Sequence, residues 1–184
     1  MRPSGTPSTG TTSPRTLAGR DIVVNDDGCA VDDLSVCGAV TVSFPGYVDW
    51  ADFVATAVHR EWVGVEALAA LPGSVGEVVT RGGAAYHQGV ADTVSSVRTW
   101  DHESDQQRTF AAADCEFAAG SSRFARQPQL ERRDVAFLLR QGALSLPITD
   151  ESLAEALGIE PGGRASLTAV RDVALARAAT PARP

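Results

Sequence analysis

A short apolar segment, Ala67–Gly76, carries one proline and two glycines and constrains this chain more than any other feature. Proline fits the first turn of a helix, where its missing N–H costs no hydrogen bond, and the glycines permit a positive φ and a close approach of the backbone. We therefore expect Pro72 to begin a helix. Free N–H groups at such a helix start form a site for a phosphate. Because proline–glycine pairs also mark ordinary turns, a simple turn is the alternative.

Length and composition predict one soluble domain. The chain has 184 residues, of which 43% are hydrophobic, enough for a single core. Its net charge of −7 argues against a nucleic-acid partner, because binding one requires clustered basic side chains on the protein.

Cys29, Cys37 and Cys115 lack Cys-x-x-Cys spacing, so we expect reduced thiols without a disulfide framework or zinc site. No segment has the apolar length of a membrane span or the core of a secretory signal, which predicts a cytoplasmic location and no membrane partner.

Hydrophobic periodicity predicts strands mixed with helices. We expect strands at 21–24, 39–44, 94–100, 108–110 and 135–140, and helices at 49–62, 65–70, 150–157 and 165–178. This order is typical of an α+β domain. Residues 17–178 would form it, between disordered tails at 1–16 and 179–184 that bury too little apolar surface to become ordered.

Several local details are expected within these elements. Trp50 and Trp62 are core anchors of the helix at 49–62. The apolar run at 135–140 is unbroken, which predicts a strand covered on both faces. Asp150 caps the start of the helix that follows it, and Gly158 ends that helix.

Five segments resemble one enzyme family in their order and spacing. They are Trp50–Val54, Trp62–Leu68, Pro72–Gly76, Ala85–Tyr86 and Thr109–Phe117, with further matches at 23–28, 122–124 and 157–162. The family is UDP-N-acetylmuramate dehydrogenase, also called UDP-N-acetylenolpyruvoylglucosamine reductase. Its members are flavoproteins of peptidoglycan precursor synthesis, in which NADPH reduces bound FAD and the flavin reduces an enolpyruvyl ether on a UDP-sugar. The resemblance implies part of an FAD-binding domain of the vanillyl-alcohol-oxidase (PCMH-type) kind, without the C-terminal substrate domain.

The resemblance also implies which positions face FAD, whose pyrophosphate the family holds with backbone N–H groups. The cofactor-binding positions are Gly19, Pro72, Gly73, Ser74, Val75, Gly76, Ala85 and Tyr86. We expect weakened binding, because only Gly19 remains of a triple-glycine loop and because Asp21 and Glu77 bring negative charge to the phosphates. Each like-charge pair costs about 1 to 4 kcal/mol near a surface, which Arg20 and Arg81 can offset. Ala84 and His87 replace family glycines, at about 1 to 2 kcal/mol each where φ is positive.

The family's catalytic side chains are missing from the matching positions. Gly120 stands where the family has its arginine, and Asp150 where it has a substrate-side tyrosine. The serine proton donor and the later glutamate belong to a segment expected beyond Pro184. Arg123 reaches the site only if its loop is rebuilt, and is otherwise a surface residue. We therefore assign no catalytic residue and no metal ligand.

Histidines and the loop serine have ordinary interpretations. His59 suits a helix C-terminus, and His87 lies in a solvated loop unless it contacts a flavin. His102, beside Asp101 and Glu103, fits a polar hairpin tip better than a metal site. Ser74 has no histidine at a motif spacing and is a loop hydroxyl rather than a nucleophile.

Three functions stay open at this stage. The first is a truncated, diverged relative of the reductase that lacks turnover. The second is a working flavoprotein, completed by a partner chain or acting on another substrate. The third is a non-enzymatic interaction module. An N-terminal strand–helix unit of the family is missing, so an uncovered apolar sheet face is expected to promote self-association or to bind a partner.

Overall fold

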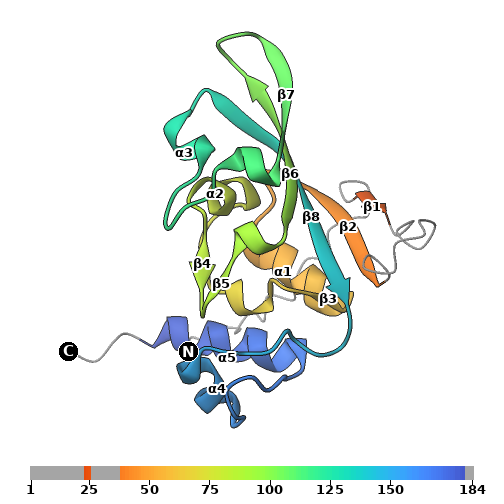
Figure 1. Cartoon of the computed structure of the whole chain (residues 1–184), viewed down its shortest axis with the longest axis vertical. Coiled ribbons are helices and arrows are strands. Elements are labelled where there is room, and N and C mark those ends of the chain that lie inside the picture. Colours follow the sequence, from red (N-terminus) through yellow and green to blue (C-terminus); the bar gives the residue numbers. More distant parts are fainter. Residues whose placement is uncertain (1–22, 26–37, 181–184) are drawn as a thin grey trace, which may run out of the picture.

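The computed structural model describes residues 23–25 and 38–180, which are built around an antiparallel sheet (Figure 1). Its strands follow the spatial order β1-β2-β8-β6-β7, and the short β3 also pairs with β8. Their bounds are Val23–Asn25 for β1, Ala39–Pro45 for β2, Trp62–Val63 for β3, Val94–Asp101 for β6, Gln106–Ala111 for β7 and Leu130–Gln141 for β8. A separate hairpin joins β4, Ala84–Ala85, to β5, Gln88–Gly89.

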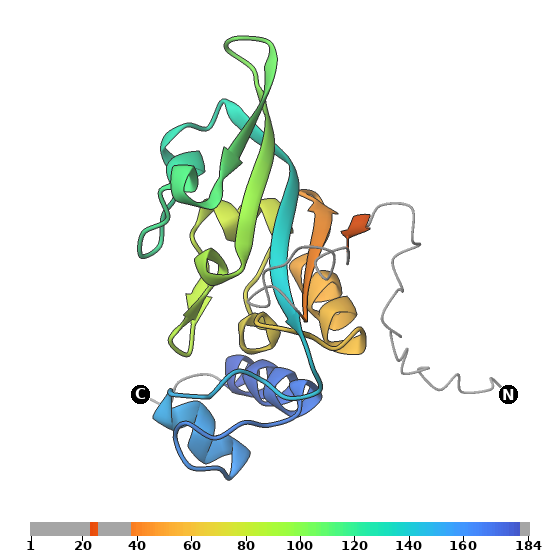
Figure 2. The same cartoon turned by 45° about the vertical axis from the view of Figure 1, so that its right-hand side comes forward.

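Helices lie alongside this sheet and beyond one end of it. The α-helices are α1 at Trp50–His59, α2 at Val75–Thr80, α3 at Arg123–Arg126, α4 at Glu151–Leu157 and α5 at Leu167–Ala179. Short 3-10 helices are η2 at Glu66–Leu68, η3 at Val90–Asp92 and η4 at Ala112–Cys115. Figures 1 and 2 both place α4 and α5 together, beyond the end of the sheet at which β8 finishes. No helix within the described residues is long and apolar enough to cross a membrane.

Aromatic side chains form the centre of the core. The ring of Phe53 lies 4.6 Å from that of Phe44, 5.1 Å from that of Trp50 and 4.5 Å from that of Phe137. Trp50 is fully buried and donates a hydrogen bond from its Nε1 to the Leu68 carbonyl at 2.8 Å. Both tryptophans predicted as core anchors are thus buried, although Trp62 belongs to β3. A second cluster joins η2 to α4 and α5 through Ala67, Ile148, Leu153, Ala154 and Val170.

The expected mixture of helices and strands is confirmed, with differences at particular boundaries. The helix predicted at 49–62 ends at His59, because Glu61 adopts a φ of 56° and Trp62 then pairs with Gln141 in β3. The helix predicted at 65–70 is reduced to the single turn of η2. The strand predicted at 135–140 begins earlier, at Leu130. The strand predicted at 21–24 is β1, and Asp21 and the tail predicted at 1–16 lie outside the described residues. Of the disordered tail predicted at 179–184, residues 181–184 also lie outside them, whereas Ala179 is the last residue of α5.

The prediction that residues 135–140 are covered on both faces is wrong. Val135, Phe137 and Leu139 are buried against the β2 side chains of the same face, whereas Leu138 is 47% exposed. This alternation is usual for an antiparallel sheet with one open face. On the open face, Thr41 of β2 pairs with Leu138, and Arg140 is the next residue of β8 on the same side. Self-association through this face stays a prediction.

Candidate functional site

The segment Pro72–Gly76 leads into α2 but does not form the helix start that the sequence predicts. Ser74 is the N-cap and α2 begins at Val75, so Pro72 lies before the helix and not in its first turn. Gly73 between them adopts a φ of 101°, a conformation that favours glycine. Pro72 and Gly73 are exposed, whereas Val75 and Gly76 are buried. Two of the five predicted phosphate-loop positions are therefore closed off from a ligand.

The backbone donors at this helix start are already used within the chain. Ser74 N–H donates to Glu77 Oε2 at 2.7 Å, and Glu77 N–H donates to Ser74 Oγ at 3.3 Å, which makes a capping box. Val75 N–H donates to the Val48 carbonyl and Gly76 N–H to the Gly46 carbonyl, both at 2.8 Å. A phosphate site needs N–H groups that are free to donate, and all four of these N–H groups already donate to acceptors within the chain. The expectation of free N–H groups at this helix start is therefore wrong, whereas the assignment of Pro72–Gly76 as cofactor-binding positions stays a prediction.

Charges beside the loop are paired with one another. Arg81 donates to the Pro72 carbonyl and lies beside Glu77, which confirms the predicted offset of the Glu77 charge by Arg81. Hydrogen bonds from Ser74, and then the charges of Arg81 and Arg132, lower the pKa of the Glu77 carboxyl. Glu77 is thus an anion at neutral pH, at the place where a phosphate was expected. Gly19, Arg20 and Asp21, which belong to the other predicted phosphate loop, lie outside the described residues.

Arg132, on β8, is a residue near this loop that the sequence did not reveal. Its Cβ lies close to both Gly46 and Gly76, and its Nε is buried without a hydrogen-bond acceptor. Burial lowers the pKa of the guanidinium, against the neighbouring charges of Glu131 and Glu77. No motif marks this arginine, because strand pairing alone brings it to the loop.

Ala85 and Tyr86, the remaining predicted cofactor positions, lie in the β4–β5 hairpin. This hairpin follows the C-terminal end of α2, whereas Pro72–Gly76 precede its N-terminal end, and a helix of this length spans about 9 Å. Tyr86 and His87 form the turn with φ values of 50° and 60°, so the positive φ expected at His87 is confirmed. Ala84 is a strand residue without a positive φ, so that expectation is wrong. Tyr86 packs against the second cluster, toward α4 and α5.

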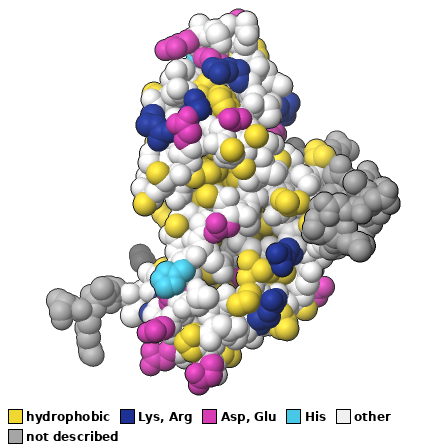
Figure 3. Space-filling model, in the orientation of Figure 1, with side chains coloured by type: hydrophobic (Ala, Val, Ile, Leu, Met, Phe, Trp, Pro, Cys, Tyr) yellow, Lys and Arg dark blue, Asp and Glu magenta, His cyan; other side chains and the backbone are white. Residues whose placement is uncertain are grey.

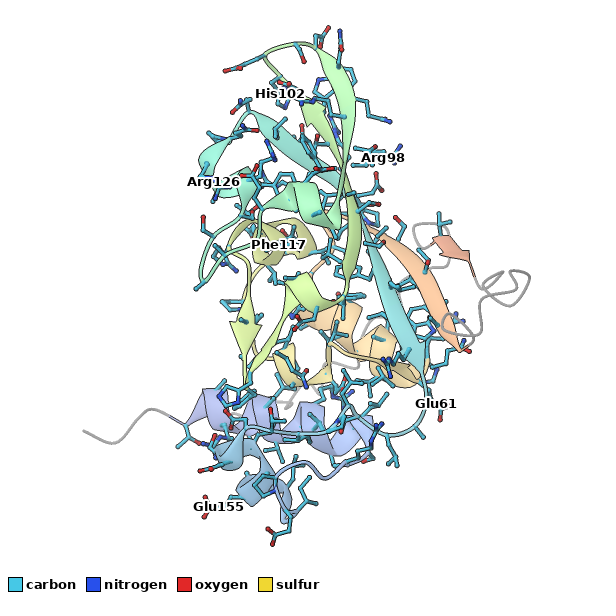
Figure 4. All side chains as sticks on the ribbon, viewed as in Figure 1. Glu61, Arg98, His102, Phe117, Arg126 and Glu155 are labelled. Carbon is cyan, nitrogen blue, oxygen red and sulfur yellow. The ribbon has the colours of Figure 1, made fainter. Side chains whose placement is uncertain are left out.

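Gly120, at the position where the family motif has an arginine, lies in the turn before α3, and Arg123 is the first residue of α3. Gly120 turns the chain with a φ of 72° between Ala118 and Ser121, which pair with each other. Arg123 is not free to replace a catalytic cation, because its guanidinium pairs with Glu116 and donates to the Asp114 carbonyl at 2.6 Å. Arg126 also pairs with Glu116 (Figure 4 labels Arg126). Arg123 is part of a local charge network rather than a solvated surface residue.

The two remaining histidines and Cys115 lie apart from the candidate site. His59 ends α1 and is exposed, and His102 lies 2.8 Å from Glu131 beyond the end of β6. No group of three or more metal-ligating side chains occurs among the described residues. Cys115 is a buried free thiol, and burial raises its pKa to about 11; the other two cysteines fall in the part of the chain left undescribed. Charged side chains gather over the β6–β7 hairpin and over α4, with apolar side chains between them (Figure 3).

Asp150 caps α4 as the sequence predicts, and it also faces the hairpin. Its Oδ1 accepts from Leu153 N–H at 2.9 Å, and its Oδ2 lies 3.8 Å from His87 Nε2. The Ser152 hydroxyl, the Leu153 amide and the charge of His87 lower the pKa of the carboxyl below its usual 3.8. At the position where the family has a substrate-side tyrosine, this chain therefore has the N-cap of α4.

We expect Asp150→Ala to cost about 1 kcal/mol of unfolding free energy, because the first turn of α4 loses its cap. Since the folded pKa lies below the unfolded value, the charge of Asp150 stabilises the protein above about pH 4 and this contribution disappears as the pH falls through the folded pKa. Asp150→Asn is the matched control, since asparagine keeps the cap without the charge. Denaturant unfolding at several pH values measures both effects. A difference between wild type and Asp150→Asn that does not change with pH would contradict the charge contribution.

Glu66 is the main polar feature that the motifs did not single out. It is fully buried in η2, and its Oε2 accepts from Gly64 N–H at 2.7 Å. Burial raises the pKa of its carboxyl, against backbone N–H groups of Glu66, Gly64 and Val65. The available signal was one acidic residue inside the apolar run from Trp62 to Leu71.

The described residues form an α+β domain with a glycine-containing loop before the short helix α2. No protein-family model matches the sequence. The chain is 39% identical over 145 residues to UDP-N-acetylenolpyruvoylglucosamine reductase of Cutibacterium acnes, covering 78% of this chain and 39% of that protein. It is 36% identical over 168 residues to the reductase of Thermobifida fusca, covering 85% of this chain and 47% of that protein. A crystal structure of the reductase from Thermus caldophilus aligns with a TM-score of 0.48 and 15% identity, over 77% of this chain and 44% of that one.

These sequence matches relate the chain to a class of reductases. More particularly, the chain is related to the UDP-N-acetylenolpyruvoylglucosamine reductases over the aligned region, which confirms the predicted resemblance. It spans less than half the length of each of these curated relatives.

Proposed function

We propose that this chain is a non-catalytic relative of the UDP-N-acetylenolpyruvoylglucosamine reductases, which keeps the scaffold of the aligned region without carrying out their reaction. The observation that carries this proposal is the helix start at Ser74–Glu77. All four of its backbone N–H groups donate to acceptors of the chain itself. A dinucleotide pyrophosphate would have to break the capping box or the two contacts to Val48 and Gly46.

FAD and NADPH are the cofactors that the family resemblance implies, and the described residues at α2 do not fit the pyrophosphate of FAD. Its phosphates require free donors or cations, whereas this helix start presents the Glu77 carboxylate. Arg81 is already paired beside that carboxylate. We therefore derive no reaction step through a flavin, and binding of a UDP-sugar is likewise not supported by any residue in the described part of the chain.

The position of the family's arginine supports the same proposal. Gly120 has no side chain, and a Cβ added there would meet nothing within 4 Å. The nearest arginine along the chain, Arg123, is held by Glu116 and Asp114. Loss of one group that stabilises charge in a transition state costs about 10²–10³ in rate, and loss of a general acid costs a similar factor.

The test is to purify the full chain and measure bound flavin and turnover. We expect a colourless protein whose melting temperature does not change with excess FAD. NADPH oxidation in the presence of UDP-N-acetylglucosamine enolpyruvate should be at least about a thousandfold slower than that of the Cutibacterium acnes reductase assayed beside it. Stoichiometric flavin released on denaturation would instead support the working flavoprotein, and NADPH-driven turnover by this chain alone would overturn the proposal.

The interaction module is tested separately by solution mass. A chain that lacks flavin but elutes as a dimer, or as a complex with a defined partner, would support that alternative. Leu138 on the open sheet face supplies the variant, because Leu138→Lys should restore a monomer if this face is the interface. A wild-type chain that is already monomeric would exclude self-association.

A further inference from the structure

The turn of the β4–β5 hairpin carries two large side chains in a conformation that favours glycine. Tyr86 and His87 connect Ala85 to its partner Gln88 and adopt φ values of 50° and 60°. A two-residue hairpin turn with two positive φ values is usually built from asparagine and glycine, because a larger side chain crowds its own backbone. Such a conformation persists only where the surrounding structure holds it. The contacts of these two side chains are therefore expected to hold the turn.

Both side chains contact the α4–α5 pair. Tyr86 packs against the second cluster, whose members include Leu153 of α4 and Val170 of α5. His87 Nε2 lies 3.8 Å from Oδ2 of Asp150, the N-cap of α4. Figures 1 and 2 both show the turn directed toward these two helices. The turn thus joins the hairpin to α4 through an apolar contact and a polar contact.

The two oxygens of Asp150 have separate roles. Oδ1 accepts from the Ser152 hydroxyl at 2.6 Å and from Leu153 N–H at 2.9 Å, whereas Oδ2 faces His87. The Ser152 hydroxyl and the Leu153 amide lower the pKa of this carboxyl, which is an anion at neutral pH. An imidazole ordinarily becomes positively charged below about pH 6.5. The attraction between the turn and α4 therefore depends on whether His87 carries a proton.

Asp150 is the acidic residue on which the charge of His87 acts most directly. Among the described residues, it is the only acid with an oxygen within 4 Å of a nitrogen of His87. Both strands of the hairpin also contact η2, and Gly89 N–H donates to Asp92 of η3 at 2.7 Å. The other charged residues on η2, η3, α4 and α5 are Glu66, Asp92, Glu151, Glu155, Arg171, Asp172 and Arg177.

We propose that the β4–β5 turn is a pH-sensitive latch on α4, in which protonated His87 pairs with Asp150 and holds the hairpin against the helix, while neutral His87 leaves this task to the packing of Tyr86. The latch is closed where His87 is protonated and Asp150 is ionised, and it loosens as the pH rises toward about 8. It goes beyond the proposed function, because it requires neither FAD nor turnover.

A double-mutant cycle on the full chain, measured near pH 5.5 and near pH 8, tests the latch. His87→Asn tolerates a positive φ and does not titrate, and Asp150→Asn keeps the cap without the charge. At the lower pH we expect the two substitutions to be coupled by about two- to fivefold in the unfolding equilibrium constant, the range of an exposed ion pair, and at the higher pH to act independently. No coupling at the lower pH, or equal coupling at both, would overturn the proposal.

The matched control replaces a histidine that lies away from the turn. His59 is exposed at the C-terminal end of α1. His59→Asn combined with Asp150→Asn should show no coupling at either pH. Coupling as large as that of His87 would mean that the effect belongs to the net charge of the protein, which would also overturn the latch.

Hydrogen exchange of the wild-type chain gives a local measurement that needs no variant to fold. Val90 N–H donates to the Gly83 carbonyl at 2.9 Å, at the end of the hairpin away from its turn. After correction for the intrinsic pH dependence of exchange, protection of this amide should be about two- to fivefold higher near pH 5.5 than near pH 8. In His87→Asn the protection should be the same at both. Equal protection of the wild-type amide at the two pH values would contradict the latch.

Discussion

Replacing Trp50 by alanine is expected to lower the free energy of unfolding by about 3–5 kcal/mol, a large part of the stability of a typical domain. The indole is fully buried and contacts the rings of Phe53 and Phe137. Its loss leaves a cavity and also removes the donor to the buried Leu68 carbonyl. Denaturant unfolding, with an unchanged slope as evidence of the same transition, measures the difference.

This substitution should also loosen the segment that leads to the candidate site. The indole donates to the Leu68 carbonyl and so holds the turn before Leu71 and Pro72. The variant keeps the backbone N–H of residue 50, which donates to the Gly73 carbonyl at 2.9 Å, so the loosening should be partial. The matched control is Tyr47→Ala, because Tyr47 is 74% exposed and should change stability by no more than about 0.5 kcal/mol. Equal effects of the two substitutions would show that Trp50 does not anchor the core.

Local signals explain which features the sequence predicted well. The spacing of Trp50, Phe53 and Val54 defines the buried face of α1 without any knowledge of its partners. Asp150 and Gly158 mark the two ends of α4 because capping depends on residues within the same turn. The family resemblance likewise rests on short segments, and the relatives confirm it.

The candidate site was predicted less well because its donors are satisfied by distant residues. Val75 and Gly76 donate to carbonyls of Val48 and Gly46, which the apolar pattern around Pro72 does not reveal. Glu77 was expected to repel a phosphate, but its role in a capping box with Ser74 depends on where α2 begins. A shift of the helix start from Pro72 to Val75 thus changes an open anion site into a closed turn.

The sequence also could not predict which single polar groups are buried. Glu66 is enclosed because α1, α5 and the β4–β5 hairpin all contact η2, and no periodicity in its own segment reports these contacts. The prediction that residues 135–140 are covered on both faces was wrong for a related reason. An unbroken apolar run fits either a doubly covered strand or one with an exposed leucine, and the antiparallel pairing decides for the second.

Gly46→Ala is the second substitution with a large expected effect, about 3 kcal/mol or more of unfolding free energy. A Cβ built on Gly46 would lie 2.2 Å from the Arg132 carbonyl oxygen and 3.1 Å from its carbon. These are backbone atoms of β8, so no side-chain rotation relieves the clash. Gly46 N–H also donates to the Arg133 carbonyl at 2.7 Å, which holds the two backbones together.

The clash should spread from Gly46 to the candidate site, because the Gly46 carbonyl accepts the hydrogen bond of Gly76 N–H in α2. Hydrogen exchange of the Gly76 amide should therefore accelerate in Gly46→Ala more than exchange of amides in α5. Gly142→Ala is the matched control, since its added Cβ would meet only Val63 Cγ2, at 3.7 Å, and should cost no more than about 0.5 kcal/mol. A Gly46→Ala protein as stable as the Gly142→Ala protein would mean that β8 can move away from the loop. In that case Val75 and Gly76 could also release their donors, and the closed helix start would no longer argue against a phosphate ligand.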